Sequence, residues 1–289
     1  MNFSYFYKGV LMKRKIFSYD LDGTLLMSNN KVHPITKKAF HDVHLKGGIN
    51  ILNTGRGLLK VLPLLDEFDG IDYFICSNGA LIYDVKNKNH IVVGQLEPEV
   101  FEQMFEYANQ NDLIISIDTS NFTATYVNKD ANGNFPEWIN KQDIMDFSHI
   151  KFSDYETMSK VANDSKSIIT QVALRNPNEI ANETTKYFND LYKDKYSVYL
   201  TNRIYTDVNP LGISKWNGLK EFMRIYNMQD CIIYAFGDSS NDVEMLQNAH
   251  FSFAMENATD DAKEAATEVI GHYNSGAIGI KLEEIIKSS

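Results

Sequence analysis

The sequence predicts an α/β protein with a three-layer, Rossmann-like core of parallel strands and an α+β cap domain inserted into it. Short apolar segments alternate with helical segments in the first and last parts of the chain, which is typical of a parallel sheet covered on both faces. Between these parts, strands with period-two alternation and amphipathic helices run for about 120 residues, too long for a loop. We expect a tail over 1–14, a core over 15–83 and 205–289, and a cap over 84–204.

The first part of the core carries strand and helix signals in a regular order. A short apolar strand is expected over 15–21, and Gly23 permits the turn that follows it. A helix is expected over 34–46, because proline lies in its first turn and two glycines follow its last residue. Strands over 49–53 and 73–76 complete a β-α-β-α-β series.

The inserted module and the returning core are predicted from the same kinds of signal. The stretch from residue 81 to residue 208 is expected to contain strands at 81–83, 91–93, 114–117, 123–127, 168–174, 196–200 and 204–208, and helices at 98–109 and 178–191. The returning core is expected to contain helices at 215–225, 242–248 and 260–267, and strands at 231–236 and 250–254.

The composition excludes several classes of partner. The 28 Lys and Arg against 38 Asp and Glu give a net charge of -10, so we expect neither nucleic acid nor an anionic membrane as a partner. Cys76 and Cys231 are the only cysteines, which excludes a disulfide framework and a thiolate zinc cluster and fits a reducing cytoplasm. Residues 1–11 are expected to be a loose tail, because basic residues follow their apolar stretch and do not precede it as in a secretory signal. We expect a monomer or a weak homo-oligomer.

Asp20 and Asp22 are the first candidate catalytic residues. The sequence has no motif for dinucleotide binding, Walker-type nucleotide hydrolysis, zinc proteolysis or serine hydrolysis, which leaves carboxylates at strand ends, where parallel sheets bind ligands. These two aspartates lie two residues apart, so an extended backbone directs both to one side. Close carboxylates repel each other, and a divalent cation is the usual remedy. An EF-hand is excluded because Leu25 stands where glycine is required. By itself the pair also fits a surface turn.

Three further groups of candidate site residues, which we call stations, lie at strand or helix ends of the same predicted domain. Thr54 and Gly55 close the second strand and offer a hydroxyl and unhindered N–H groups for phosphate oxygens. Lys215 lies at the start of the helix that re-enters the core. The last station, after the most apolar strand, comprises Asp238, Asn241 and Asp242. Each station alone also fits a turn, a solvated charge or a helix N-cap, but their conjunction in this order predicts one site.

These stations resemble the four motifs of the haloacid dehalogenase-like superfamily of phosphatases. The matching stretches are Asp20-Leu21-Asp22-Gly23-Thr24-Leu25, Thr54-Gly55-Arg56, Lys215, and Gly237-Asp238-x-x-Asn241-Asp242. The module between the second and third motifs looks like the type-two (IIB) cap of that superfamily. Ser77-Asn78-Gly79-Ala80 and Asn241-Asp242-Val243-Glu244-Met245-Leu246 look like its Cof-type subfamily.

The resemblance implies a role for each station. Asp20 is expected to be the nucleophile that forms an aspartyl-phosphate, and Asp22 the acid and base that serves the leaving alcohol and then the attacking water. Mg²⁺ is expected to be held by Asp20, the main-chain carbonyl of Asp22 and Asp238, with Asp242 holding a metal-bound water or orienting the shell. The phosphate is expected to be bound by Thr54, Gly55, Lys215 and Asn241.

Two assignments and the substrate stay open at this stage. Arg56 is a candidate for substrate contact or for an ion pair with a neighbouring acid, and Asn78 for substrate contact or for a turn. The resemblance implies hydrolysis of a small phosphorylated metabolite, with a sugar phosphate as the leading substrate class. A sugar phosphomutase of the same superfamily and a non-catalytic metabolite-binding regulator are the alternatives.

Overall fold

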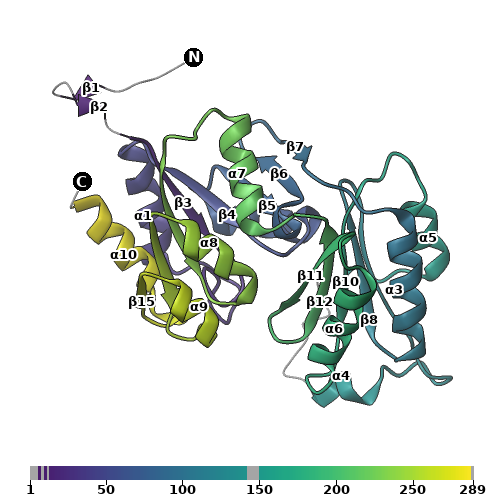
Figure 1. The fold of residues 1–289 in the computed structure, drawn as a ribbon. Helices are drawn as coiled ribbons and strands as arrows, with labels where there is room; N and C mark the ends of the chain where they lie inside the picture. Colours follow the sequence, from purple (N-terminus) through teal and green to yellow (C-terminus); the bar gives the residue numbers. More distant parts are fainter. Residues whose placement is uncertain (1–5, 8–9, 12, 142–149, 288–289) are drawn as a thin grey trace.

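The computed structural model describes residues 6–7, 10–11, 13–141 and 150–287. It consists of a core domain and a cap domain that lie side by side (Figure 1). The core is built on an eight-stranded sheet in the order β15-β14-β13-β3-β4-β5-β6-β7. Its strands are β3 (Lys15–Tyr19), β4 (Ile49–Asn53), β5 (Tyr73–Cys76), β6 (Leu81–Asp84), β7 (Asn89–Val92), β13 (Ile232–Gly237), β14 (Phe251–Met255) and β15 (Glu268–Ile270).

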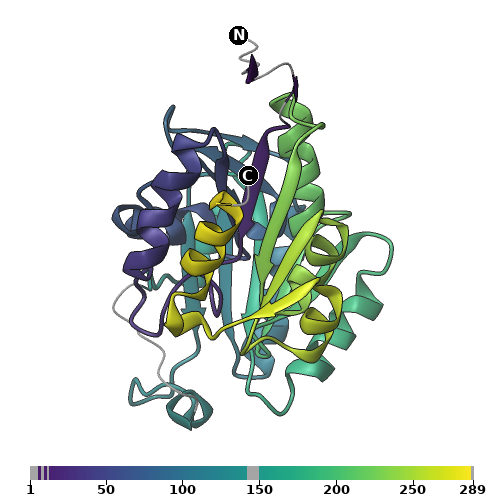
Figure 2. The same cartoon turned by 90° about the vertical axis from the view of Figure 1, so that its left-hand side faces the viewer.

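Helices cover both faces of this sheet, so the predicted three-layer α/β core is confirmed. One face carries α1 (Pro34–Leu45), α2 (Leu58–Val61), the 3₁₀ turn η1 (Leu62–Phe68) and α10 (Ala277–Lys287); the other carries α7 (Lys215–Ile225), α8 (Val243–Asn248) and α9 (Asp260–Ala265). Figure 2 shows α1 and α10 side by side on one face. Along β3, Phe17 and Tyr19 pack toward α1 and α10, whereas Ile16 packs toward α7. This alternation is the period of two expected of a strand buried on both faces.

The boundaries of α1 show how local sequence fixes an element. Pro34 occupies the first helical turn and His33 caps the helix, its ring nitrogen accepting a hydrogen bond from the Ile35 N–H at 3.3 Å. At the other end Gly47 has a φ of 74°, a conformation that glycine adopts without steric cost. Its N–H donates to the carbonyl of His44 at 2.8 Å, which satisfies one of the open carbonyls at the end of the helix.

The cap is an antiparallel sheet with three of its described helices on one face, and a fourth against one end of the other face. Its strands lie in the order β11-β12-β10-β8-β9. They are β8 (Ile114–Thr119), β9 (Thr123–Val127), β10 (Ile169–Arg175), β11 (Tyr196–Thr201) and β12 (Tyr205–Pro210). The helices are α3 (Pro98–Gln110), α4 (Glu137–Lys141), α5 (Tyr155–Ala162) and α6 (Ala181–Leu191). Apolar side chains of α3, α5 and α6 pack against one face of the sheet, which leaves the other face toward the core domain.

The strands near both predicted domain boundaries join sheets other than those that the boundaries imply. β6 pairs antiparallel with β5, and β7 pairs antiparallel with β6, so this hairpin extends the core sheet, although the sequence-based boundary at residue 83 cuts it. β12 pairs with β10 and β11 in the cap, although the boundary at 205 gave it to the core. The reason is that alternating side chains define a strand but not the sheet it joins. We therefore propose a cap that extends from about residue 93 to 210.

The predicted tail is described only in part. β1 (Phe6–Tyr7) and β2 (Val10–Leu11) pair with each other in a two-stranded sheet. Residues 1–5, 8–9 and 12 lie outside the described residues. Among the helices that the structure describes, none combines the length and the apolar character needed to span a bilayer.

Candidate active site

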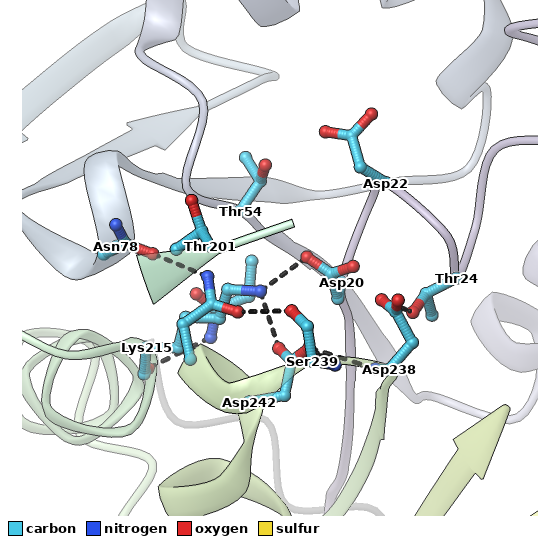
Figure 3. Close-up of polar contacts among 12 residues, drawn as sticks. Asp20, Asp22, Thr24, Thr54, Asn78, Thr201, Lys215, Asp238, Ser239 and Asp242 are labelled. Carbon is cyan, nitrogen blue, oxygen red and sulfur yellow. Dashed lines mark hydrogen bonds and ion pairs between the residues drawn. The ribbon is translucent and has the colours of Figure 1, made fainter. Parts of the chain in front are cut away.

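Three neighbouring strands bring the predicted catalytic residues to one edge of the core sheet. β13, β3 and β4 are adjacent and parallel, so their carboxyl ends open at the same edge. Asp20 follows β3, and its N–H donates to the Phe236 carbonyl of β13 at 2.9 Å. Thr54 follows β4 and Asp238 follows β13. Figure 3 shows these side chains gathered in one group with Lys215 and Asp242.

Lys215 lies at the centre of the group. Its Nζ donates to Oδ1 of Asp20 at 2.5 Å and to Oδ1 of Asp242 at 2.6 Å, and its side chain is 0% exposed. Ser214 positions it by capping α7, its hydroxyl accepting from the Asn217 N–H at 3.1 Å. A Cβ at Gly79 would lie 2.3 Å from the Ser214 carbonyl oxygen, so this close approach of α7 to the turn at 77–79 requires glycine.

The charges in this group control one another. Burial acts to lower the pKa of Lys215, but the carboxylates of Asp20 and Asp242 outweigh it and hold that pKa above its ordinary value. Burial raises the pKa of Asp20 to about 6, although Lys215 acts in the opposite direction. At neutral pH Lys215 is therefore a cation and Asp20 is mostly a carboxylate, which leaves Asp20 suited to act as a nucleophile.

Asp238 completes a cluster of three carboxylates with Asp20 and Asp242. One oxygen of each lies within 4.8 Å of the others. Burial, Asp20 and Asp242 together raise the pKa of Asp238 to about 9, which is the mark of excess negative charge in a confined space. The Thr24 hydroxyl donates to Asp238 Oδ1 at 2.9 Å. Gly23, with a φ of 82°, passes so close that a Cβ there would lie 2.5 Å from Asp238 Oδ2.

The donor set fits a hard divalent cation. Carboxylate oxygens are the ligands that Mg²⁺ prefers, and three carboxylates lie close together here. A cation among them would relieve the repulsion that raises the pKa of Asp238. Asp242 is the exception in the cluster. Its Oδ1 accepts from Lys215, while its Oδ2 accepts from the N–H groups of Asp238 (3.0 Å) and Ser239 (3.1 Å). Both oxygens are thus engaged, which suits a residue that orients the other ligands.

Asp22 lies apart from that cluster and is paired with Arg56. Arg56 Nε donates to Asp22 Oδ2 at 2.8 Å, and Nη2 donates to Oδ1 at 2.5 Å. The two side chains are 30% and 31% exposed, so the pair faces the solvent side of the site. The Asp22 carboxylate thus lies beside the buried group around Lys215, whereas the Asp20 carboxylate belongs to that group, although the two aspartates are only two residues apart.

The remaining predicted residues lie around the same edge. Thr54, Gly55 and Asn241 line a cavity next to Asp20. Asn241 Nδ2 donates to Oδ1 of Asn78 at 2.9 Å. Asn78 is buried and bonds onward to the cap, because its Nδ2 donates to Asn209 Oδ1 at 3.1 Å. Asn78 thus bridges the two domains, and we propose this bridging role for it in place of direct substrate contact.

The cavity lies between the strand ends of the core and the open face of the cap sheet. Its volume is about 490 Å³, enough for a metabolite. The cap contributes a polar wall, formed by Ser116, Asp118, Thr123, Thr125, Gln171, Arg175, Thr201, Tyr205 and Asp207. Lys60 of α2 ties this wall to the core by donating to Asp118 Oδ2 at 2.8 Å.

Sequence reasoning missed these cap residues and two core residues. Thr24 lies inside the first motif, and its hydroxyl four residues after Asp20 was a signal that could have been used. Lys60 and the cap wall carry no such signal, because their positions depend on how antiparallel strands pair in the folded cap.

Comparison with known proteins places the chain in a family. The family model for haloacid dehalogenase-like hydrolases matches residues 17–282. This chain belongs to that family. The haloacid dehalogenase-like chain is 29% identical to the 5-amino-6-(5-phospho-D-ribitylamino)uracil phosphatase YcsE of Bacillus subtilis, over 87% of this chain and 88% of the relative.

Solved structures of haloacid dehalogenase-like proteins share the whole fold. A haloacid dehalogenase-like hydrolase from Bacillus subtilis superposes with a TM-score of 0.77 at 18% identity, over 93% of this chain and 99% of that one. A subclass IIB sugar phosphatase superposes with a TM-score of 0.73 at 22% identity, over 95% and 99%. These likenesses show the fold, and they confirm the predicted α/β core with a type-two cap.

Proposed function

We propose that this hydrolase is a Mg²⁺-dependent phosphatase that cleaves small phosphorylated metabolites, with sugar phosphates as the leading class, through an aspartyl-phosphate at Asp20. One observation carries the proposal. The buried ammonium of Lys215 is shared by Asp20 and Asp242 beside Asp238, at the carboxyl ends of three adjacent strands. A carboxylate held in this way, next to a cation site and an open cavity, matches the needs of phosphoryl transfer.

The first step forms the covalent intermediate. A carboxylate oxygen of Asp20 attacks phosphorus in line with the leaving oxygen, so that a new O–P bond forms while the ester P–O bond breaks. Asp22 gives its proton to the leaving oxygen and an alcohol departs. Lys215 keeps Asp20 oriented, and Thr54, Gly55 and Asn241 hold the phosphoryl oxygens.

The second step releases phosphate. Asp22 takes a proton from a water molecule, whose oxygen attacks phosphorus as the bond to Asp20 breaks. Asp20 is then regenerated as a carboxylate and inorganic phosphate leaves. Asp20, Asp238 and the main-chain carbonyl of Asp22 would hold Mg²⁺, with Asp242 orienting these ligands. When bound, the ion supplies the positive charge that lets a phosphate dianion approach this acidic edge.

The substrate class rests on the cavity and on one relative. The wall that the cap offers is rich in hydroxyls, carboxylates and amides and is suited to a polar leaving group. The relative in Bacillus subtilis is named for a substrate with a phosphorylated ribityl chain, which is a polyol phosphate. Two buried cysteines without a disulfide fit our expectation of a reducing cytoplasm.

Two alternatives remain distinguishable by experiment. A sugar phosphomutase would share the Asp20 intermediate but would return the phosphoryl group to a sugar and need a bisphosphate activator. A non-catalytic regulator would keep the site and bind metabolites without turnover. Steady release of inorganic phosphate without an activator excludes the first alternative, and any turnover that depends on Asp20 excludes the second.

The test is phosphate release from p-nitrophenyl phosphate, with Mg²⁺ present and with the metal chelated. We expect steady release by the wild type only with Mg²⁺, and none above background from Asp20→Asn. Equal activity of the wild type and Asp20→Asn would overturn the proposal. Full activity of the wild type in chelator would overturn its metal dependence alone.

A further inference from the structure

Gln171 occupies the middle of the wall that the cap presents to the cavity. It belongs to β10, where Val172 and Leu174 pack into the apolar layer between the cap sheet and its helices. The alternating residues Gln171, Ala173 and Arg175 therefore lie on the opposite face, and all three line the cavity. Gln171 is nevertheless only 3% exposed.

Asp207 fixes the orientation of the Gln171 amide. Asp207, on the neighbouring strand β12, is hydrogen-bonded by the side chain of Gln171. An ionised carboxylate only accepts hydrogen bonds, so the amide Nε2 must be the donor in this contact. Asp207 is itself held by the Thr201 hydroxyl at 2.9 Å and by Asn78 Nδ2 at 3.3 Å. The amide group of Gln171 is thus anchored by its nitrogen.

The oxygen of the same amide has no hydrogen-bond donor in the described part of the chain. Gln171 Oε1 is buried and has no hydrogen-bond partner among the described residues. Asp118 of the same wall, by contrast, is paired, since it accepts from Lys60 at 2.8 Å and from Thr123 at 2.7 Å. A buried acceptor without a donor is unfavourable, and native proteins rarely keep one without a reason. Gln171 lines the cavity, so a molecule bound there is the nearest source of a donor for this oxygen.

We propose that Gln171 determines specificity by accepting a hydrogen bond at Oε1 from a hydroxyl group of the leaving alcohol. The substrate would then be a polyhydroxylated phosphate monoester, such as a polyol or sugar phosphate, and simple alkyl or aryl phosphates would be poor substrates. The core holds the phosphoryl end through Thr54 and Asn241, so the cap wall meets the rest of the molecule. This inference rests on the proposed phosphatase function and adds the residue that selects the substrate.

The test compares three substrates in the presence of Mg²⁺: ribitol 5-phosphate, pentyl phosphate and p-nitrophenyl phosphate. The variant is Gln171→Met, which keeps the length of the side chain and removes the acceptor. We expect its kcat/KM for ribitol 5-phosphate to fall about 10- to 100-fold, because a donor hydroxyl loses its partner. Its kcat/KM for the other two substrates should stay at the wild-type value. Gln103→Met, in the exposed outer layer of the cap on α3, is the matched control and should change none of the three.

Several outcomes overturn the inference. An equal loss on all three substrates, or no loss on any, would mean that Gln171 is structural. The ratio of kcat/KM between two substrates, measured in one preparation, does not depend on the fraction of inactive protein. A variant that folds poorly therefore still tests the predicted change in substrate preference. If Gln171→Met does not fold at all, the wild type decides, because an equal kcat/KM for ribitol 5-phosphate and pentyl phosphate contradicts the inference. Asp20→Asn keeps the two proposals separate, since activity surviving in it contradicts the phosphatase proposal itself.

Discussion

Arg56 donates two hydrogen bonds from its guanidinium to the Asp22 carboxylate, at 2.8 Å and 2.5 Å. It thereby holds Asp22, which we propose to act as both acid and base, at the entrance of the cavity. A planar fork of this kind fixes both the position and the rotation of a carboxylate. A lysine in the same place supplies the charge but lacks the fork. We therefore interpret Arg56 as a residue that positions Asp22.

This interpretation predicts that Arg56→Met lowers kcat/KM for ribitol 5-phosphate about 10- to 100-fold, because a misplaced acid loses its alignment with an alcohol leaving group, which needs a proton to depart. Arg56→Lys should recover only part of the loss. The measurement that separates positioning from general damage is a double-mutant cycle with Asp22→Asn. If Arg56 acts through Asp22, its replacement costs little in the Asp22→Asn background, and an undiminished cost there would refute this role.

Lys215 should be as important for stability as for chemistry. Replacing it with methionine leaves Asp20 and Asp242 buried without their cation, which costs about 3–5 kcal/mol of unfolding free energy for a buried pair. Mg²⁺ should restore part of that loss, because it compensates the same carboxylates. Chemical denaturation with and without Mg²⁺ measures both effects. Lys220→Met, an exposed position on the same helix, is the control, and a loss no larger than the control's would argue against the buried network.

Most of the candidate residues at the strand ends could be predicted from the sequence, but the residues of the cap wall could not. Asp20, Thr54 and Asp238 each follow an apolar strand, and parallel strands bring such positions together whatever the details of packing. Gln171 and Asp207 meet only because β10 pairs with β12 in one register, and no local pattern fixes the register of distant antiparallel strands.

The choice between two roles for Arg56 shows the same limit. The guanidinium lies 34 residues from Asp22 in sequence, and residue type alone fits both a substrate contact and an ion pair. The contact between the two side chains is seen only in the folded structure. The same limit applies to β12, because an alternating strand does not indicate which sheet it will join, and β12 joins the cap sheet.

Asp207 should make stability depend on pH. Burial raises its pKa from an ordinary 3.8 to about 6, so the folded chain binds more protons than the unfolded chain between these values. Its contribution to stability is therefore best at low pH, declines as the pH rises through this window, and at neutral pH amounts to a cost of roughly 3 kcal/mol.

The measurement is the unfolding free energy of the wild type minus that of Asp207→Asn, followed from below pH 4 to pH 7. We expect this difference to fall by roughly 3 kcal/mol as the pH rises, since the variant does not titrate at this position. Asp190→Asn, an exposed position on α6, serves as the control. A difference that does not change with pH would show that Asp207 titrates normally.

The proposed metal site predicts which of the two aspartates of the first motif matters more for Mg²⁺ affinity. The Asp20 carboxylate belongs to the three-carboxylate cluster, whereas the Asp22 side chain is bonded to Arg56 and would offer the ion only its main-chain carbonyl. Asp20→Asn should therefore weaken Mg²⁺ binding at least about tenfold, and Asp22→Asn should change it little. Calorimetric titration of both variants with Mg²⁺ measures this, and the reverse order would contradict the assignment.

The most direct measurement is to trap the phosphoryl group on the protein. Asp22→Asn should slow hydrolysis of the intermediate, so a brief reaction of this variant with p-nitrophenyl phosphate and Mg²⁺, quenched in acid, should leave one phosphoryl group on the protein. Borohydride reduction followed by peptide mass spectrometry then locates it. Our account predicts the modification at Asp20 and nowhere else. A phosphoryl group found on another residue, or none at all while the wild type releases phosphate, would contradict the central claim that Asp20 is the nucleophile.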